Sequence, residues 1–157
     1  MRQMSPALKQ FLLISGAFIS LWILWSAFFN AAMDTLDFPF SIELGGASIV
    51  QAAGNAEEPV QAKTGSKAAT FTLKDGRLSS GDFILGRYAS EDRSFLPKPV
   101  LWFKKTDGDG PKVQRVTAKE KDGSFQLIFS GAGLIVEDGQ VFADLSGNDE
   151  SKLVAKN

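Results

Sequence analysis

The chain has 157 residues and a formal net charge of −1, with 44% hydrophobic residues and neither cysteine nor histidine. These missing side chains exclude a disulfide framework, thiol redox chemistry, zinc sites with nitrogen or sulfur ligands, and any nucleophile activated by histidine. The near-zero net charge, without a polybasic run, gives no reason to expect a nucleic-acid partner.

An uncharged apolar run extends from Phe11 to Phe29. As a helix this run spans roughly 28 Å, which is close to the hydrocarbon thickness of a bilayer. A cleaved signal peptide has a shorter apolar region followed by small residues, whereas the exit here is the bulky sequence SAFFNAAM. We therefore predict a transmembrane helix over residues 11–33 that is retained as a signal anchor.

Four residues of this segment are candidates for contacts inside or at the membrane. Gly16 and Ser20 have the small-xxx-small spacing that lets a second helix approach closely, although chance spacing is the alternative. Trp22 and Trp25 lie three residues apart, which fits an aromatic belt at the membrane surface or packing on a partner helix. We predict that these four side chains make the membrane helix contacts.

The charges on either side of the apolar run predict its orientation. Arg2 and Lys9 precede the run, and the next basic residue after it is Lys63. By the positive-inside rule, residues 1–10 form a short cytoplasmic N-terminus, and the rest of the chain is extracytoplasmic, in the periplasm, a lumen or the exterior. Cleavage of the segment as an export signal would place the downstream part on the same side.

Residues 34–68 are predicted to form a juxtamembrane strand and a flexible tether. The sequence DFPFSIEL alternates polar and apolar residues with period two, which indicates a strand with one apolar face. Pro39 removes a ladder hydrogen bond, so we expect an edge strand or a strand that lies flat along a partner. Residues 45–68 are rich in Gly, Ala, Glu and Lys, which favours a mobile tether, with a surface loop of a larger domain as the alternative.

Residues 69–157 are predicted to form an extracytoplasmic β domain. Short apolar runs alternate with turn signals, and the Asp-Gly pairs that begin at residues 75, 122 and 138 are typical of hairpin turns. About six to eight short strands at this spacing indicate an all-β fold, either an antiparallel sandwich or a small barrel. The expected strands lie in ATFTLK, GDFILGRY, PVLWFKK, KVQRVTA, SFQLIF and GAGLIVEDGQVFADL, with LVA at 153–155 as a further candidate.

The stretch GRYASEDRSFLPKP, residues 86–99, is the densest polar segment of the predicted domain. A long charged loop between two strands, which also holds the only tyrosine, is a candidate site for a ligand or partner. A solvated loop with local salt bridges, each worth about 0–1 kcal/mol, is the alternative. The candidate binding residues of this loop are Arg87, Tyr88, Glu91, Asp92 and Arg93.

Trp102 is a further candidate, because together with Tyr88 and Phe103 it could supply a flat aromatic platform for a sugar or a partner. Adjacent residues of a strand point to opposite faces, so Trp102 and Phe103 cannot both line one core. The alternative is a strand that is covered on both faces.

Asp107, Gly108 and Asp109 resemble the start of a calcium loop. Pro111 occupies the place of the third oxygen ligand, and no glutamate closes the loop. We therefore predict a turn here, and we expect neither a metal site nor a cofactor.

These observations together predict a non-catalytic single-pass membrane protein that serves as an accessory or assembly subunit of a membrane complex. Its partners would be the lipid bilayer and other subunits of that complex, and no catalytic residue is expected. One alternative is a secreted β-rich module that binds a glycan or a protein after signal-peptide cleavage. Another is a small hydrolase that uses carboxylates.

Mass spectrometry of the N-terminus of the natural protein tests the anchor. A retained anchor predicts a mature chain that begins near residue 1 and stays with the membrane fraction, because the apolar run remains in lipid. A mature chain that begins at residue 33 or later, free of membranes, would instead show a released module.

Overall fold

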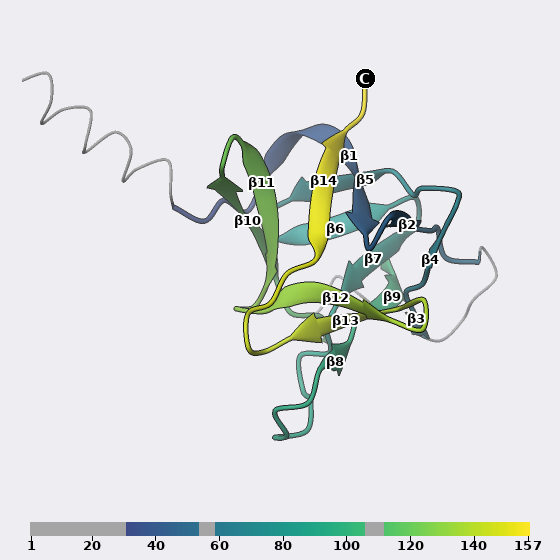
Figure 1. The fold of residues 1–157 in the computed structure, drawn as a ribbon, viewed down its shortest axis with the longest axis vertical. Coiled ribbons are helices and arrows are strands. Elements are labelled where there is room, and N and C mark those ends of the chain that lie inside the picture. The colour runs from purple at the N-terminus through teal and green to yellow at the C-terminus, as the bar shows by residue number, and fades with distance from the viewer. Residues whose placement is uncertain (1–30, 54–58, 106–111) are drawn as a thin grey trace, which may run out of the picture. The chain divides into compact units, whose positions relative to one another are not determined.

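A computed structural model describes residues 31–53, 59–105 and 112–157 of the chain. The described residues include fourteen β strands, which form three antiparallel sheets (Figure 1). The predicted all-β class is therefore confirmed. Residues 1–30 and 106–111 lie outside the described residues, so the predicted contacts of Gly16, Ser20, Trp22 and Trp25 and the turn at 107–111 do too.

The described end of the predicted membrane helix is not helical. Met33 forms an antiparallel bridge with Ala118, in which each amide donates to the other residue's carbonyl oxygen at 2.7 Å. The predicted boundary at residue 33 is corrected, because the backbone there is already paired within the β domain. None of the described residues belongs to a helix that is long and apolar enough to cross a bilayer.

The largest sheet has nine strands and curls into a half-barrel (Figure 1). Its strand order is β3-β9-β7-β6-β5-β1-β2-β4, and β14 pairs with β1 outside this path. The strands are β1 (Leu36–Leu44), β2 (Ala47–Ile49), β3 (Val60–Gln61), β4 (Thr64–Gly65), β5 (Phe71–Lys74), β6 (Arg77–Ser80), β7 (Phe83–Gly86), β9 (Leu101–Lys104) and β14 (Ser151–Ala155).

Two smaller sheets complete the domain. A two-stranded hairpin and a three-stranded sheet in the order β12-β13-β8 lie beside the curled sheet. Their strands are β8 (Lys98–Pro99), β10 (Val116–Lys121), β11 (Ser124–Phe129), β12 (Gly133–Glu137) and β13 (Gln140–Asp144).

Strand β1 lies inside the large sheet and not at its edge, which corrects the expectation drawn from Pro39. Phe40 is paired on both sides, with Phe71 of β5 and with Ala155 of β14. The ladder to β5 is irregular between Leu36 and Phe40, which is the interval that contains Pro39. A bulge leaves a residue out of the ladder, so the missing amide hydrogen of proline is tolerated in an interior strand.

The predicted tether over residues 45–68 is also corrected, apart from residues 54–58, which lie outside the description. Strand β2 forms a hairpin with β1, β4 pairs with β2, and β3 pairs with β9. The Ala62 amide donates to the Val100 carbonyl oxygen at 2.9 Å, and Ala62 is fully buried. Small residues here permit close backbone pairing, whereas the composition alone indicated mobility. Ala32–Asn157 therefore form one compact unit.

The three Asp-Gly pairs form the predicted hairpin turns. They connect β5 to β6, β10 to β11 and β12 to β13. Both residues of each pair have positive φ, for example 51° at Asp75 and 78° at Gly76. This is the conformation of a type I′ turn, whose twist matches that of the strands it joins.

One continuous hydrophobic core lies between the curled sheet and the two smaller sheets. At its centre the Phe71 ring stacks on Trp102, with ring centroids 5.6 Å apart, and on Phe40 at 6.2 Å. The smaller sheets contribute Val116, Ala118, Leu127, Phe129, Leu134, Val141 and Ala143. A second cluster on the opposite face of β7 and β9 consists of Ile84, Leu101, Phe103 and Val113.

Replacement of Phe71 by alanine should lower the free energy of unfolding by about 3–5 kcal/mol, because it leaves a cavity in the fully packed core. The same change at exposed Phe95 should alter it by less than about 0.5 kcal/mol. Urea unfolding of the full-length variants, followed by circular dichroism, measures both values. Equal losses at the two positions would contradict the assigned core.

Candidate functional site

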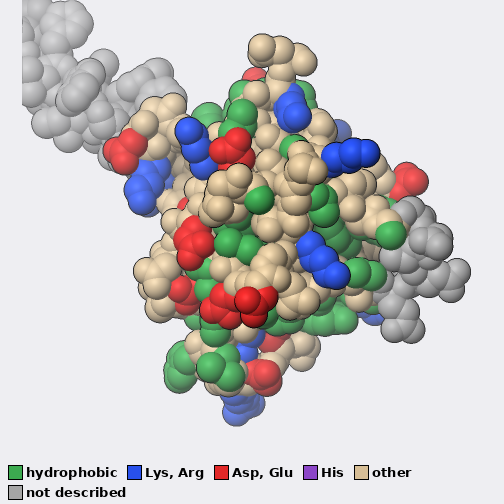
Figure 2. All heavy atoms as spheres, turned by 45° about the vertical axis from the view of Figure 1, so that its right-hand side comes forward, with side chains coloured by type: hydrophobic (Ala, Val, Ile, Leu, Met, Phe, Trp, Pro, Cys, Tyr) green, Lys and Arg blue, Asp and Glu red, His purple; other side chains and the backbone are tan. Residues whose placement is uncertain are grey.

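A loop of residues 87–97 leaves the large sheet after β7 and returns through β8, which belongs to the three-stranded sheet. We call it the projecting loop, because it extends beyond β8 at the lower end of the β domain in Figure 1. Figure 2 shows hydrophobic and charged side chains gathered at the same end of the domain. The two ends of the loop are thus held by two different sheets.

Arg87 fixes the start of the projecting loop from inside the domain. Its guanidinium donates to the carbonyl oxygens of Phe129, at 2.6 Å, and Ser130, at 3.3 Å. It also forms a two-pronged ion pair with Glu91, from Nη2 to Oε1 at 2.6 Å and from Nε to Oε2 at 3.3 Å. Both side chains of this pair are largely buried. Because a buried charge is costly without its partner, the pair holds the first turn of the loop against the end of β11.

The segment after residue 111 binds the main chain at the same end of the loop. Gln114 donates from Nε2 to the Tyr88 carbonyl oxygen at 2.6 Å, and the Ala89 amide donates to the Lys112 carbonyl oxygen at 2.7 Å. The Tyr88 ring packs edge-on against Phe103, with ring centroids 5.3 Å apart. These contacts leave the start of the loop little freedom to move.

Lys98 fixes the other end of the loop from the first residue of β8. Its buried ammonium donates to the Asp92 carboxylate, to the Asp92 carbonyl oxygen at 3.2 Å and to the Ser94 hydroxyl at 3.0 Å. Oδ1 of Asp92 also accepts from the Ser94 amide at 3.0 Å and from the Ser94 hydroxyl at 2.6 Å. An ammonium has three donors, and each of them finds an acceptor here. We call Asp92, Ser94 and Lys98 the Lys98 clamp.

The clamp keeps Asp92 ionised. Hydrogen bonds from Lys98, and then from the Ser94 hydroxyl and amide, lower the pKa of Asp92 from 3.8 to about 2. The Asp92 side chain is mostly exposed, so the cause is the set of donors around one oxygen and not burial. A carboxylate that is charged and engaged in this way is unsuited to act as a general acid at neutral pH.

The residues between and beyond these supports are exposed to solvent. Phe95 has 92% of its surface exposed and Leu96 has 70%, the highest fractions among large hydrophobic residues in the described part of the chain. Tyr88 and Arg93 are also exposed. Burial of a side chain such as phenylalanine in a partner is worth about 1.5–3 kcal/mol. The loop therefore presents two apolar side chains whose burial would stabilise a complex with another molecule.

The structure places five of the six predicted binding residues on the projecting loop, and it gives them different roles. Arg87, Glu91 and Asp92 are engaged in contacts within the domain. Tyr88 and Arg93 remain accessible.

Trp102 does not join the loop residues, and its predicted place on an aromatic platform is corrected. It is 2% exposed and belongs to the main core, because it points to the face of β9 opposite Phe103. Phe103 is covered by the Tyr88 ring. Both faces of this strand are therefore covered, as the alternative interpretation of the sequence held.

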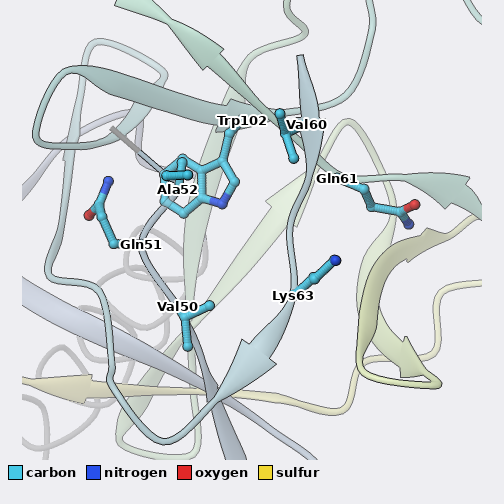
Figure 3. Close-up of a pocket in the computed structure, with 8 residues that line it drawn as sticks. Val50, Gln51, Ala52, Val60, Gln61, Lys63 and Trp102 are labelled. Carbon is cyan, nitrogen blue, oxygen red and sulfur yellow. The ribbon is translucent and has the colours of Figure 1, made fainter. Parts of the chain in front are cut away.

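One side of Trp102 borders a hollow of about 190 Å³ next to β3 (Figure 3). Val50, Ala52 and Val60 form apolar walls, and Gln51, Gln61 and Lys63 also line it. This volume is below the roughly 300 Å³ at which ligand pockets begin. Its lining residues Ala53 and Val60 stand on either side of residues 54–58, which lie outside the description, so we assign it no ligand. Among the described side chains, no acidic cluster could hold a metal ion.

Sequence reasoning missed Ser94, Phe95, Leu96 and Lys98 as parts of the site. The signal was present in the letters SFLPKP, where two large apolar residues interrupt a polar loop directly before Pro97. Charge density drew attention to the ionic residues instead. Which of these ions are engaged internally depends on contacts with β8 and β11, and those contacts are not visible in a local pattern.

Comparison with protein-family models gives a match. A family model described as peptidase inhibitor I66 matches residues 67–155, which is more than half of the chain. The matched residues begin just before β5, end with β14 and include the whole projecting loop. No significant match is found among curated proteins or solved structures.

Acidification should release the Lys98 clamp with a midpoint near pH 2. Because the folded-state pKa of Asp92 is depressed, its contribution to loop order is complete above about pH 3.8 and is lost as the pH falls through about 2. The NMR shift of the Asp92 carboxyl carbon measures this midpoint. Lys98→Met, which removes the strongest donor, should raise it toward 3.8. A native midpoint at or above 3.8 would contradict the clamp.

Proposed function

The chain belongs to the peptidase inhibitor I66 family, and we propose on that basis that its β domain binds a peptidase and blocks it without catalysing a reaction itself. Among the functions predicted from the sequence, the module that binds a protein ligand lies nearest to this proposal. The projecting loop is the part of the domain that would contact the peptidase.

The single observation that carries this proposal is the combination of exposure and fixation in the projecting loop. Phe95 and Leu96 are exposed to solvent, while Asp92 and Ser94 before them accept hydrogen bonds from buried Lys98, which begins β8 just beyond Pro97. Binding costs roughly 0.5–1.5 kcal/mol for each flexible side chain that becomes ordered, so a loop fixed in advance binds more tightly. A fixed loop also resists rearrangement inside the cleft of the enzyme that it enters.

The contacts of the acidic residues weigh against the alternative of a carboxylate-dependent hydrolase. Glu91 is paired with Arg87, and Asp92 is ionised within the Lys98 clamp. Hydrolysis by two carboxylic groups needs one that is protonated and can donate. The geometry of this loop instead supports a role in binding.

The membrane anchor is a separate part of the proposal and rests on the sequence alone. We keep the prediction that the apolar run within residues 11–33 holds the β domain at the extracytoplasmic face of a membrane. The peptidase would then be one that reaches that face. The role of accessory subunit in a membrane complex stays a prediction.

A peptidase panel tests the proposed function. Full-length protein in mild detergent is added to chymotrypsin, trypsin, subtilisin, papain, pepsin and thermolysin, and hydrolysis of small peptide substrates is followed. We expect near-stoichiometric inhibition of at least one enzyme, because a preorganised loop should occupy its cleft. The absence of inhibition and of binding across the panel would contradict the proposal.

A loop variant tests whether the projecting loop is the surface that contacts the peptidase. Joint replacement of Arg93, Phe95 and Leu96 by glycine should abolish inhibition, since these are the accessible side chains at the tip of the loop. Val60→Ala, which changes an exposed apolar residue of β3 instead, should leave inhibition unchanged. Inhibition that survives the loop variant would place the contact surface elsewhere on the domain.

A further inference from the structure

Three exposed side chains near the tip of the projecting loop are available to enter a specificity pocket. They are one basic residue, Arg93, and two apolar residues, Phe95 and Leu96. The pocket of a peptidase that accepts arginine is acidic, whereas a pocket that accepts phenylalanine is a hydrophobic slot. The residue that enters therefore decides which class of peptidase is bound.

Arg93 lies in the middle of a closed turn. Asp92 accepts hydrogen bonds from both the amide and the hydroxyl of Ser94, so the chain from 92 to 94 curls around the Asp92 carboxylate. A chain that docks on another protein as an added strand is extended and offers its backbone donors to that protein. The Ser94 amide is already engaged within the turn. Arg93 is thus exposed in a conformation that does not suit docking in an extended cleft.

Leu96 is followed by a proline. With Leu96 in the pocket, the next residue in the cleft would be Pro97, which has no amide hydrogen to donate and whose ring crowds the preceding residue. Leu96 is also less exposed than its neighbour, at 70% against 92%. Both observations favour Phe95, the residue before Leu96, as the one that enters the pocket.

Phe95 lies outside the closed turn at Arg93, and it is not followed by a proline. It follows the Lys98 clamp directly, so the backbone that leads into it is fixed through Ser94. Leu96, the residue after it, has an ordinary amide, and Pro97 and Lys98 then fix the chain beyond. A phenylalanine side chain loses little rotamer freedom on burial for the apolar area that it contributes.

We infer that Phe95 fills the primary specificity pocket, and that the target is a peptidase whose pocket accepts large aromatic or apolar side chains. This inference rests on the proposed function, because it names the class of peptidase for the same loop. Arg93 lies outside the pocket, near its rim, where its charge has a small effect on affinity.

Inhibition constants of the full-length protein against chymotrypsin and trypsin test the inference. We expect chymotrypsin to be inhibited and Phe95→Ala to weaken that inhibition by about 30-fold or more, as for an anchor at the centre of an interface. Phe95→Lys should transfer inhibition to trypsin, since the lysine would then occupy the acidic pocket. Val60→Ala, the exposed apolar control on β3 outside the loop, should leave the chymotrypsin constant unchanged.

The results distinguish failure of the inference from failure of the proposed function. Inhibition of trypsin that is lost in Arg93→Ala, or inhibition of chymotrypsin that survives Phe95→Ala, overturns the assignment of Phe95 and leaves the inhibitor function intact. Inhibition of no enzyme in the wider panel overturns both. An unfolding midpoint of Phe95→Ala equal to that of the parent protein excludes misfolding as the cause of a loss.

Discussion

Two buried cations, Arg87 and Lys98, stand at the two ends of the projecting loop, and the course of the chain between them follows from their need for acceptors. A charge held away from water destabilises the fold by several kcal/mol unless partners surround it. Glu91, Asp92 and Ser94 supply those partners. Phe95, which follows Ser94, is left exposed to solvent.

The rest of the domain provides the rigid positions that these cations require. Arg87 directly follows β7 in the curled sheet, while Lys98 begins β8 in the three-stranded sheet, and one core joins the two. Residue 86 must be a glycine, since a Cβ at this position would lie 2.7 Å from Cγ1 of Val113. Without a side chain there, Val113 can pack over β7 and bring Gln114 within reach of the loop. The site is thus an extension of the core packing.

Much of the fold could be predicted from local patterns, because alternation and Asp-Gly turns act between neighbours in sequence. Those patterns indicated β5, β11 and β14 and the hairpins that join paired strands. They failed at Pro39 and over residues 45–68, where strands that are distant in sequence supply the hydrogen-bond partners of the backbone. The segment that holds the candidate site was predicted, but the roles of its individual residues were not. A sequence shows which residues carry charge. Only the folded chain shows that Arg87 and Lys98 are buried and bind acceptors within the domain.

Small secreted domains commonly brace their binding loops with covalent cross-links between sulfur atoms. In this chain, which lacks cysteine, ionic hydrogen bonds from two cations brace the loop instead. A reductant such as glutathione finds no disulfide bond to cleave in this chain. The shape of the loop is consequently indifferent to the redox potential of its surroundings.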